Sequence, residues 1–198
     1  MGEHIDRTGI RIGMWLFLYS EIILFGGLFV LYAAYFHQYP KNFAESGREL
    51  NRIVGSINTV ILLFSSFTVA ASITAIRKKS KKLAIFLITF SILCGALFLT
   101  IKYFEWGDHI RQDIYPNSQT LQNGLPGVNI FFGLYYVITG LHGLHVIIGM
   151  TLLSISLAFI LNGRVNEDRF SMLENAGLYW HLVDMIWIFV FPLFYLVL

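Results

Sequence analysis

Five long stretches of apolar residues, separated by short polar connections, define the pattern of this chain. They cover residues 12–36, 53–76, 83–104, 130–161 and 178–198. Roughly 20 residues are needed to cross about 30 Å of hydrocarbon as a helix, and every stretch reaches about that length. Backbone groups in lipid must satisfy their own hydrogen bonds, which a helix achieves. The pattern predicts an all-α integral membrane bundle of five transmembrane helices, forming one domain over residues 1–198.

The basic residues of the connections predict how the bundle is oriented. Cytoplasmic loops carry an excess of Lys and Arg. The N-terminal tail and the second and fourth connections share one side of the membrane and hold nine such residues, whereas the opposite side holds five. The nine are Arg7, Arg11, Arg77, Lys78, Lys79, Lys81, Lys82, Arg164 and Arg169, and the five are Lys41, Arg48, Arg52, Lys102 and Arg111. We therefore expect a cytoplasmic N-terminus and a periplasmic C-terminus.

Composition narrows the range of functions. Only 13% of the residues are charged, against roughly 25% in soluble domains, and the net charge of +2 gives no argument for a nucleic-acid partner. A single cysteine, Cys94, excludes an intrachain disulfide and a cysteine-based metal site. The connections leave no room for a soluble catalytic domain, and no nucleotide-binding, hydrolase or metalloprotease motif is present. We expect no catalytic centre, cofactor or metal in this chain.

Glu21 is the clearest candidate for a functional residue within a span. It lies about nine residues into the first stretch, in the run WLFLYSEIILFGGLF. A charged group at the centre of a membrane helix costs ~2.5–3.5 kcal/mol, so such residues usually face protein and often mark function. Two interpretations stay open. In the first, the carboxyl exchanges protons or anchors a contact with another subunit. In the second, the carboxyl bonds to a neighbouring helix and holds the bundle in register.

Histidines in the last two spans form a second group of candidates. His142 and His145 are three positions apart in TGLHGLHVIIG, as are His181 and Asp184 in YWHLVDMIW. Residues at this spacing share a helix face, but each pair supplies two ligands where a stable metal site needs three or four. We therefore expect interhelical hydrogen bonds at these positions, and neither a metal nor a haem site.

The run KYFEWGDH, residues 102–109, is predicted to lie at the outer end of the third span. Lys102, Tyr103 and Trp106 have the character of anchors at the membrane interface. Asp108 and His109 follow them and are expected at the surface.

Five runs of sequence, one from each span, resemble the third subunit of haem-copper oxidases. They are GMWLFLYSEIILFGGLF, NTVILLFSS, KYFEW, TGLHGLHVIIG and ENAGLYWHLVDMIWIFVFPLFYL. The runs occur in the order found in that family and cover nearly the whole chain. The most specific of them are HGLHV and YWHxVDxxW, whose joint occurrence at the right separation is very improbable by chance.

The resemblance implies an accessory subunit of an oxidoreductase complex in a bacterial cytoplasmic membrane. Such a subunit binds no haem or copper and packs directly on subunit I, which carries both, reduces oxygen to water and pumps protons. The other implied partners are subunit II, a small subunit IV and structural phospholipid. The resemblance further implies that the subunit sustains proton uptake, protects the active site during turnover and holds lipids. A cytochrome c oxidase is favoured over a quinol oxidase.

The resemblance also assigns roles to individual residues. The buried, proton-related carboxylate of the family falls on Glu21. Structural, lipid or subunit contacts are implied for Glu105, His142, His145, Glu174, His181 and Asp184. Longer members of the family have seven spans, and this chain lacks the first two. The lipid-filled cleft between those two spans and the other five is therefore expected to be absent or completed by another subunit.

Three alternatives remain beside this hypothesis. The chain could serve as subunit III of a quinol oxidase or accompany a nitric oxide reductase. A function of a different class is a small proton-coupled transporter that uses Glu21. Transporters often show inverted repeats and helices broken at corresponding positions. No repeat is visible here, and Pro192 is the in-span proline that stands out, which disfavours transport.

Overall fold

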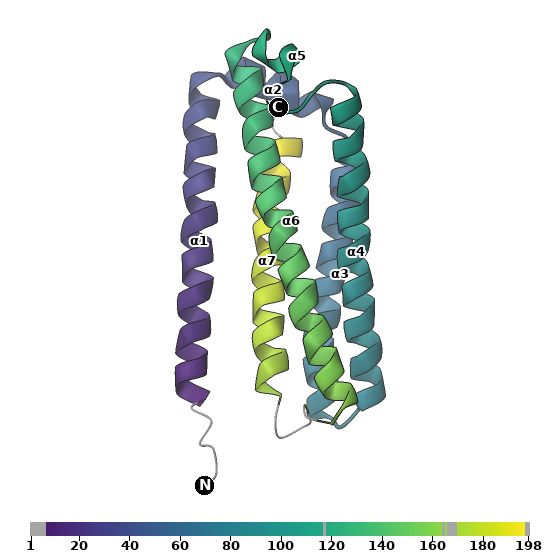
Figure 1. Ribbon diagram of the computed structural model, residues 1–198. Coiled ribbons are helices and arrows are strands. Elements are labelled where there is room, and N and C mark those ends of the chain that lie inside the picture. Colours follow the sequence, from purple (N-terminus) through teal and green to yellow (C-terminus); the bar gives the residue numbers. More distant parts are fainter. Residues whose placement is uncertain (1–6, 117, 164, 166–169, 197–198) are drawn as a thin grey trace.

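The computed structural model describes residues 7–116, 118–163, 165 and 170–196. Within these residues the chain is helical, with short connections. The helices are α1 (Arg7–Gln38), α2 (Pro40–Glu49), α3 (Arg52–Arg77), α4 (Lys81–Arg111), α5 (Gln119–Gln122), α6 (Pro126–Leu161) and α7 (Ser171–Tyr195). The five long helices run side by side, and α2 and α5 lie across the end at which α7 finishes (Figure 1).

All five long helices are apolar and long enough to cross a membrane. The candidate spans are Ile12–Gln38, Arg52–Arg77, Lys81–Arg111, Pro126–Leu161 and Ser171–Tyr195. This confirms the expected all-α bundle with five long apolar helices. The orientation stays a prediction. Arg164 and Arg169, which contribute to it, lie outside the described residues.

Local signals explain where the helices begin and end. Asn51 caps α3, because its Oδ1 accepts hydrogen bonds from the backbone N–H groups of Ile53 and Val54 at 3.0 and 3.2 Å. Pro40 and Pro126 stand in the first turns of α2 and α6, where a missing N–H group costs no hydrogen bond. Between α3 and α4, Lys79 takes a left-handed backbone conformation with φ of 60° and reverses the chain.

Two features differ from the sequence-based expectation. The third span was predicted to end near residue 104, but α4 continues to Arg111 and carries the whole KYFEWGDH run on a helix. The helix α2 was not predicted, because its sequence PKNFAESGRE is too polar for a span. Its buried Phe43 packs edge-on against Tyr32 and Phe131, which fastens α2 to α1 and α6.

Glycines allow the inner helices to approach closely around Trp180. A Cβ atom on Gly149 of α6 would lie 2.7 Å from the Trp180 ring, and one on Gly95 of α4 would lie 2.8 Å from it. The fully buried Trp180 ring of α7 is thus enclosed by two helix backbones, and its Nε1 donates to the Ser65 hydroxyl of α3 at 2.8 Å. One side chain therefore ties α3, α4, α6 and α7 together.

The first helix is attached to this group more loosely. Only 11% of its apolar window is buried, against 33–56% in the other four spans. It packs at the edge of the bundle against α6 and α7 (Figure 1). Most of its large apolar side chains, including Trp15, Ile22 and Val30, are exposed.

Candidate functional site: buried ionisable groups of the bundle

Glu21 of α1 and His145 of α6 form a direct contact within the apolar part of the bundle. The Glu21 Oε2 lies 2.8 Å from the His145 Nε2, and the two side chains are 13% and 9% exposed. Sequence reasoning singled out both residues. The structure adds that they are partners, although 124 positions separate them.

The hydrogen bonding of His145 fixes the proton content of this contact. Its Nδ1 lies 2.7 Å from the Leu141 carbonyl oxygen, which can only accept a hydrogen bond, so Nδ1 carries a hydrogen. The Nε2 atom then accepts from a protonated Glu21, or donates to its carboxylate as part of an imidazolium. In either form one proton lies between the two side chains, because two bare lone pairs would repel each other. The pair is therefore a hydrogen-bonded link between α1 and α6.

Aromatic side chains surround the Glu21–His145 pair. Tyr179 stacks on the His145 ring with a centroid distance of 6.4 Å, and its hydroxyl donates to the His145 carbonyl oxygen at 3.3 Å. Phe25 meets the same ring edge-on at 5.3 Å, and Phe17 stacks on Tyr179. This shell holds the imidazole in one orientation toward α1.

His142 has a very different environment from its neighbour His145. It is fully buried, with its ring between Phe98 and Trp187 at centroid distances of 5.5 and 5.0 Å. Neither ring nitrogen has a hydrogen-bond partner among the described residues. The two histidines, three positions apart, thus do not act on a common ligand here.

The predicted residues of α7 are also separated from one another. His181 Nδ1 forms a hydrogen bond of 2.6 Å with the Ser66 hydroxyl of α3. Asp184 is buried, and its carboxylate has no hydrogen bond of normal geometry within the described part of the chain, although Ser66 lies beside it. Glu174 pairs with Arg77 of α3 at 2.6 Å near the end of the bundle. His181 and Glu174 therefore each form a polar contact with α3.

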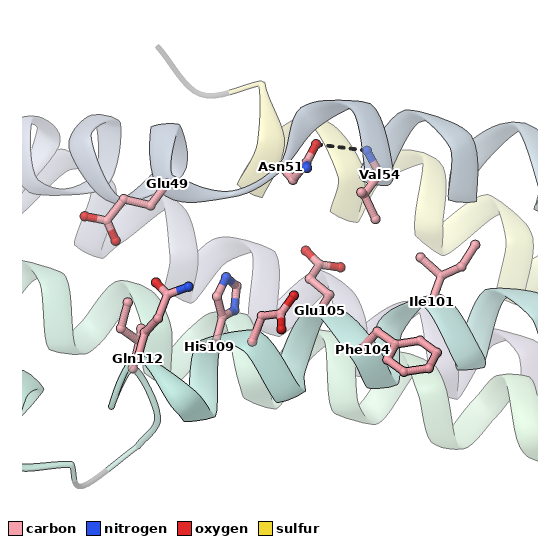
Figure 2. Close-up of a pocket in the computed structure, with 10 residues that line it drawn as sticks. Glu49, Asn51, Val54, Ile101, Phe104, Glu105, His109 and Gln112 are labelled. Atoms are coloured by element: carbon pink, nitrogen blue, oxygen red, sulfur yellow. Dashed lines mark hydrogen bonds between the residues drawn. The ribbon is translucent and has the colours of Figure 1, made fainter.

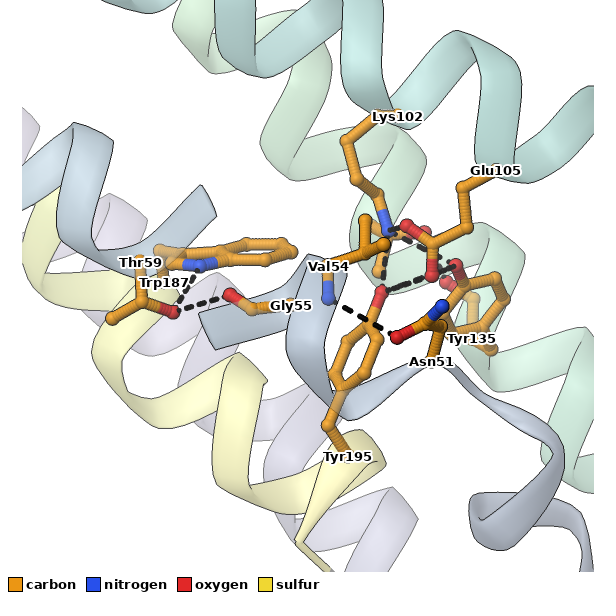
Figure 3. Close-up of polar contacts among 10 residues, drawn as sticks. Asn51, Val54, Gly55, Thr59, Lys102, Glu105, Tyr135, Trp187 and Tyr195 are labelled. Atoms are coloured by element: carbon orange, nitrogen blue, oxygen red, sulfur yellow. Dashed lines mark hydrogen bonds and ion pairs between the residues drawn. The ribbon is translucent and has the colours of Figure 1, made fainter. Parts of the chain in front are cut away.

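A second charged cluster lies near the other end of the bundle and includes Lys102 and Glu105 of α4. The Lys102 Nζ donates to the Glu105 Oε2 at 2.9 Å and to the hydroxyls of Tyr135 and Tyr195 at 2.9 and 2.7 Å. Both hydroxyls donate in turn to the Glu105 Oε1, at 3.0 and 2.5 Å (Figure 3). We call these four residues the lysine cluster. It joins α4, α6 and α7 through a closed set of hydrogen bonds.

The positions of Lys102 and His109 differ from those expected for the KYFEWGDH run. Lys102 was expected at the membrane interface and His109 at the surface, but they are only 6% and 8% exposed. Tyrosines of α6 and α7 cover the lysine, and His109 packs against Phe132 and Tyr135. Tyr103, in contrast, is exposed as an interfacial anchor would be.

Tyr135 and Tyr195 were missed by sequence reasoning. The spacing of Lys102 and Glu105 on one helix face was a visible signal for an ion pair. Nothing distinguished the two tyrosines from the eight others in the chain, which has ten. Only the packing of α6 and α7 against α4 selects them.

No metal centre emerges from these groups. Among the described residues, no three His, Cys, Asp or Glu side chains come together as a metal ion requires. The ionisable groups that form hydrogen bonds instead link one helix to another. The fold and these contacts define a multi-pass membrane protein, held together by polar pairs inside an apolar bundle.

Comparison with known proteins identifies the family. The profile of cytochrome c oxidase subunit III matches residues 1–197, and the chain belongs to this family. It is 34% identical to the cytochrome c oxidase subunit 3 of Thermostichus vulcanus over 195 residues, which are 98% of this chain and 89% of that protein. The resemblance seen in the five sequence runs is thereby confirmed.

Two further relatives show the range of complexes in which such chains occur. A probable quinol oxidase subunit 3 of Staphylococcus saprophyticus is 28% identical over 193 residues, covering 94% of this chain and 88% of that protein. The heme-copper oxidase subunit I+III of Aeropyrum pernix is 33% identical over 208 residues, covering 98% of this chain but only 24% of that protein. The chain is thus a subunit III of a haem-copper oxidase, and subunits of this family lack the redox metals.

Proposed function

We propose that this chain is the non-catalytic subunit III of a cytochrome c oxidase and packs directly on subunit I. Its other partners are subunit II, a small subunit IV and structural phospholipid in a bacterial cytoplasmic membrane. The N-terminus faces the cytoplasm. Support for the direct contact comes from the Aeropyrum pernix relative, whose name combines subunits I and III. The higher identity to the Thermostichus vulcanus protein favours cytochrome c as the donor.

A quinol oxidase is the second candidate. The observation in its favour is the Staphylococcus saprophyticus relative, which matches over nearly its full length. Because the electron donor is bound by other subunits, the preference for cytochrome c rests on sequence identity and not on a donor-binding site in this chain.

The Glu21–His145 pair is the part of this chain that we assign to proton uptake. It binds a proton in an apolar region, and it connects the loosely packed α1 to the rest of the bundle. A group that binds a proton away from bulk water can hold it for transfer when turnover depletes the supply. The other predicted residues, His142, His181, Asp184, Glu174 and Glu105, serve the structure of the bundle and its contacts with subunits or lipid.

Purification of this chain in mild detergent from its native membrane tests the assignment to an oxidase. We expect a large multi-span partner, together with a haem-copper signal in the reduced-minus-oxidised optical spectrum. A c-type haem or a cytochrome c-binding subunit in the preparation would support the favoured donor. A stable chain that emerges alone and colourless would contradict the assignment.

A further inference from the structure

A cavity of about 340 Å³ opens beside the lysine cluster, at the end of the bundle that carries α2. It lies between the end of α2, the start of α3 and the last turns of α4 (Figure 2). Its polar lining consists of Glu49, Asn51, Glu105, Asp108, His109 and Gln112. None of the functions considered above uses this cavity.

The charges around the cavity favour a cation. Lys102 already neutralises Glu105 from the protein side. Asp108 pairs with Arg111 at 3.3 Å, but both side chains are largely exposed and such pairs bind weakly. Burial raises the pKa of Glu49, and no ion pair of Glu49 occurs among the described residues. The lining therefore holds acceptors and negative charge that no cation among the described residues fully compensates.

His109 provides a second and independent indication of a ligand. Its side chain is directed from α4 into the cavity, between Glu105 and Gln112 (Figure 2). The residue is 8% exposed, and its Nδ1 has no hydrogen-bond partner among the described residues. Buried polar groups are nearly always hydrogen-bonded. The His109 imidazole can therefore accept a hydrogen bond from a ligand that enters the cavity.

The arrangement of these acceptors fits a guanidinium better than a metal ion. A metal requires several ligands converging on one point, and no such group of three exists within the described chain. A guanidinium instead presents five N–H donors in a planar fork and reaches acceptors that lie apart. Glu49, Asp108 and His109 offer such separated acceptors around one space.

We propose that the cavity receives an arginine side chain of a partner subunit, so that this end of the bundle is a docking surface in the oxidase complex. The inference rests on the proposed assembly with other oxidase subunits. The arginine would pair with Glu49 and Asp108 and donate to His109. It would thereby supply the positive charge that the cavity lacks.

Photo-crosslinking in the intact complex identifies the occupant. A benzophenone amino acid is placed at Gln112, which lines the cavity, and the membranes are illuminated before purification. We expect a crosslink to a segment of another subunit that contains an arginine. The same amino acid at Phe64, an exposed residue of α3 away from the cavity, should not label that segment. Crosslinks only to lipid, or to a partner segment without arginine, would overturn the proposal.

A charge variant tests the contact by a second route. The variant Glu49→Gln/Asp108→Asn should dissociate from the purified complex about tenfold faster, because the docked partner would enclose both carboxylates and loss of one side of an enclosed charge pair acts chiefly on dissociation. Glu45→Gln, an exposed residue of the same α2 helix that does not line the cavity, should dissociate as the wild type does. An unchanged rate in the double variant contradicts the arginine contact while leaving the oxidase assignment intact. Absence of any haem-copper partner from the wild-type preparation would instead refute the assignment itself.

Discussion

Lys102 and Tyr195 are 93 positions apart in the chain, yet the Lys102 Nζ donates to the Tyr195 hydroxyl at 2.7 Å. Through the same hydroxyl the last turn of α7 reaches Glu105 of α4. A buried ion pair is costly to form unless its remaining donors and acceptors are satisfied. Tyr135 and Tyr195 satisfy them here, so the four residues of the lysine cluster form one structural unit.

Removing one charge from this unit should destabilise the chain strongly. We expect Lys102→Met to cost about 3–5 kcal/mol, because the Glu105 carboxylate is left buried without its partner. Cys94 is the single cysteine and is buried. Its labelling by a thiol reagent during heating of the solubilised complex therefore measures unfolding. The double variant Lys102→Met/Glu105→Gln should lose less than the sum of the two single variants. Additive losses would show that the two residues do not act as a pair.

The packing around Trp180 gives a prediction for two glycines of the same helix. Gly149→Ala should destabilise the bundle by about 1–3 kcal/mol, since its Cβ would lie 2.7 Å from the Trp180 ring. Gly133→Ala, where a Cβ would meet no atom within 4 Å, should stay within about 0.5 kcal/mol of the wild type. Labelling of Cys94 on heating again provides the measurement. Equal stability of the two variants would contradict the close approach of α6 and α7.

The hydrogen bond between Ser66 and His181 links α3 to α7 and should contribute about 1 kcal/mol. His181→Phe and Ser66→Ala should therefore both lower the unfolding temperature. The combined variant should lose little more than the worse of the two, since both changes remove the same bond. Unfolding of the solubilised complex measures all three. If the two losses simply add, each residue has a separate role.

Asp113 makes the connection after α4 sensitive to acid. The Thr120 hydroxyl donates to its Oδ2 at 2.6 Å, and this bond, helped by the Thr120 backbone N–H, lowers the pKa of Asp113. A lowered pKa in the folded state means that the ionised carboxylate stabilises the connection at pH values above the ordinary pKa of 3.8. That contribution is lost as the pH falls from this value through the lower folded pKa.

Amide exchange between α4 and α6, corrected for its intrinsic pH dependence, measures this effect. Protection should be constant from neutral pH down to about 5 and should fall only below the ordinary pKa. Thr120→Val removes the hydroxyl donor and brings the folded pKa of Asp113 toward its ordinary value, so protection should be lower at neutral pH and its fall in acid should be smaller. If Thr120→Val and wild type have the same protection at neutral pH and lose the same amount in acid, the hydrogen bond does not control the connection.

The sequence predicted those features of the structure that depend on the local pattern of apolar and polar residues. Each of the five spans follows from an apolar run, because crossing a membrane depends on length and hydropathy alone. Glu21 and His145 could be singled out for the same reason, since an ionisable group in an apolar run is unusual. Their pairing could not be predicted, because it depends on how α1 rests against α6.

The burial of Lys102 and His109 near the end of α4 could not be predicted from the sequence. Lys102 and His109 follow an apolar run, which is the pattern of an interfacial segment. Whether such residues are exposed depends on the side chains that other helices place over them, here Tyr135, Tyr195 and Phe132. The cavity between α2 and α4 likewise depends on α2, whose polar sequence gave no sign of a buried contact.

The proton-binding role of Glu21 is tested most directly by turnover and proton pumping of the purified oxidase carrying Glu21→Gln, measured as a function of pH. The amide cannot carry the proton that lies between Glu21 and His145. We therefore predict lower turnover or pumping at high pH, where protons are scarce, with unchanged haem spectra. Glu174→Gln, which removes a carboxylate from the more exposed pair with Arg77, should behave as the wild type. Wild-type turnover and pumping in Glu21→Gln across the whole pH range would contradict the account and leave the pair a structural contact between α1 and α6.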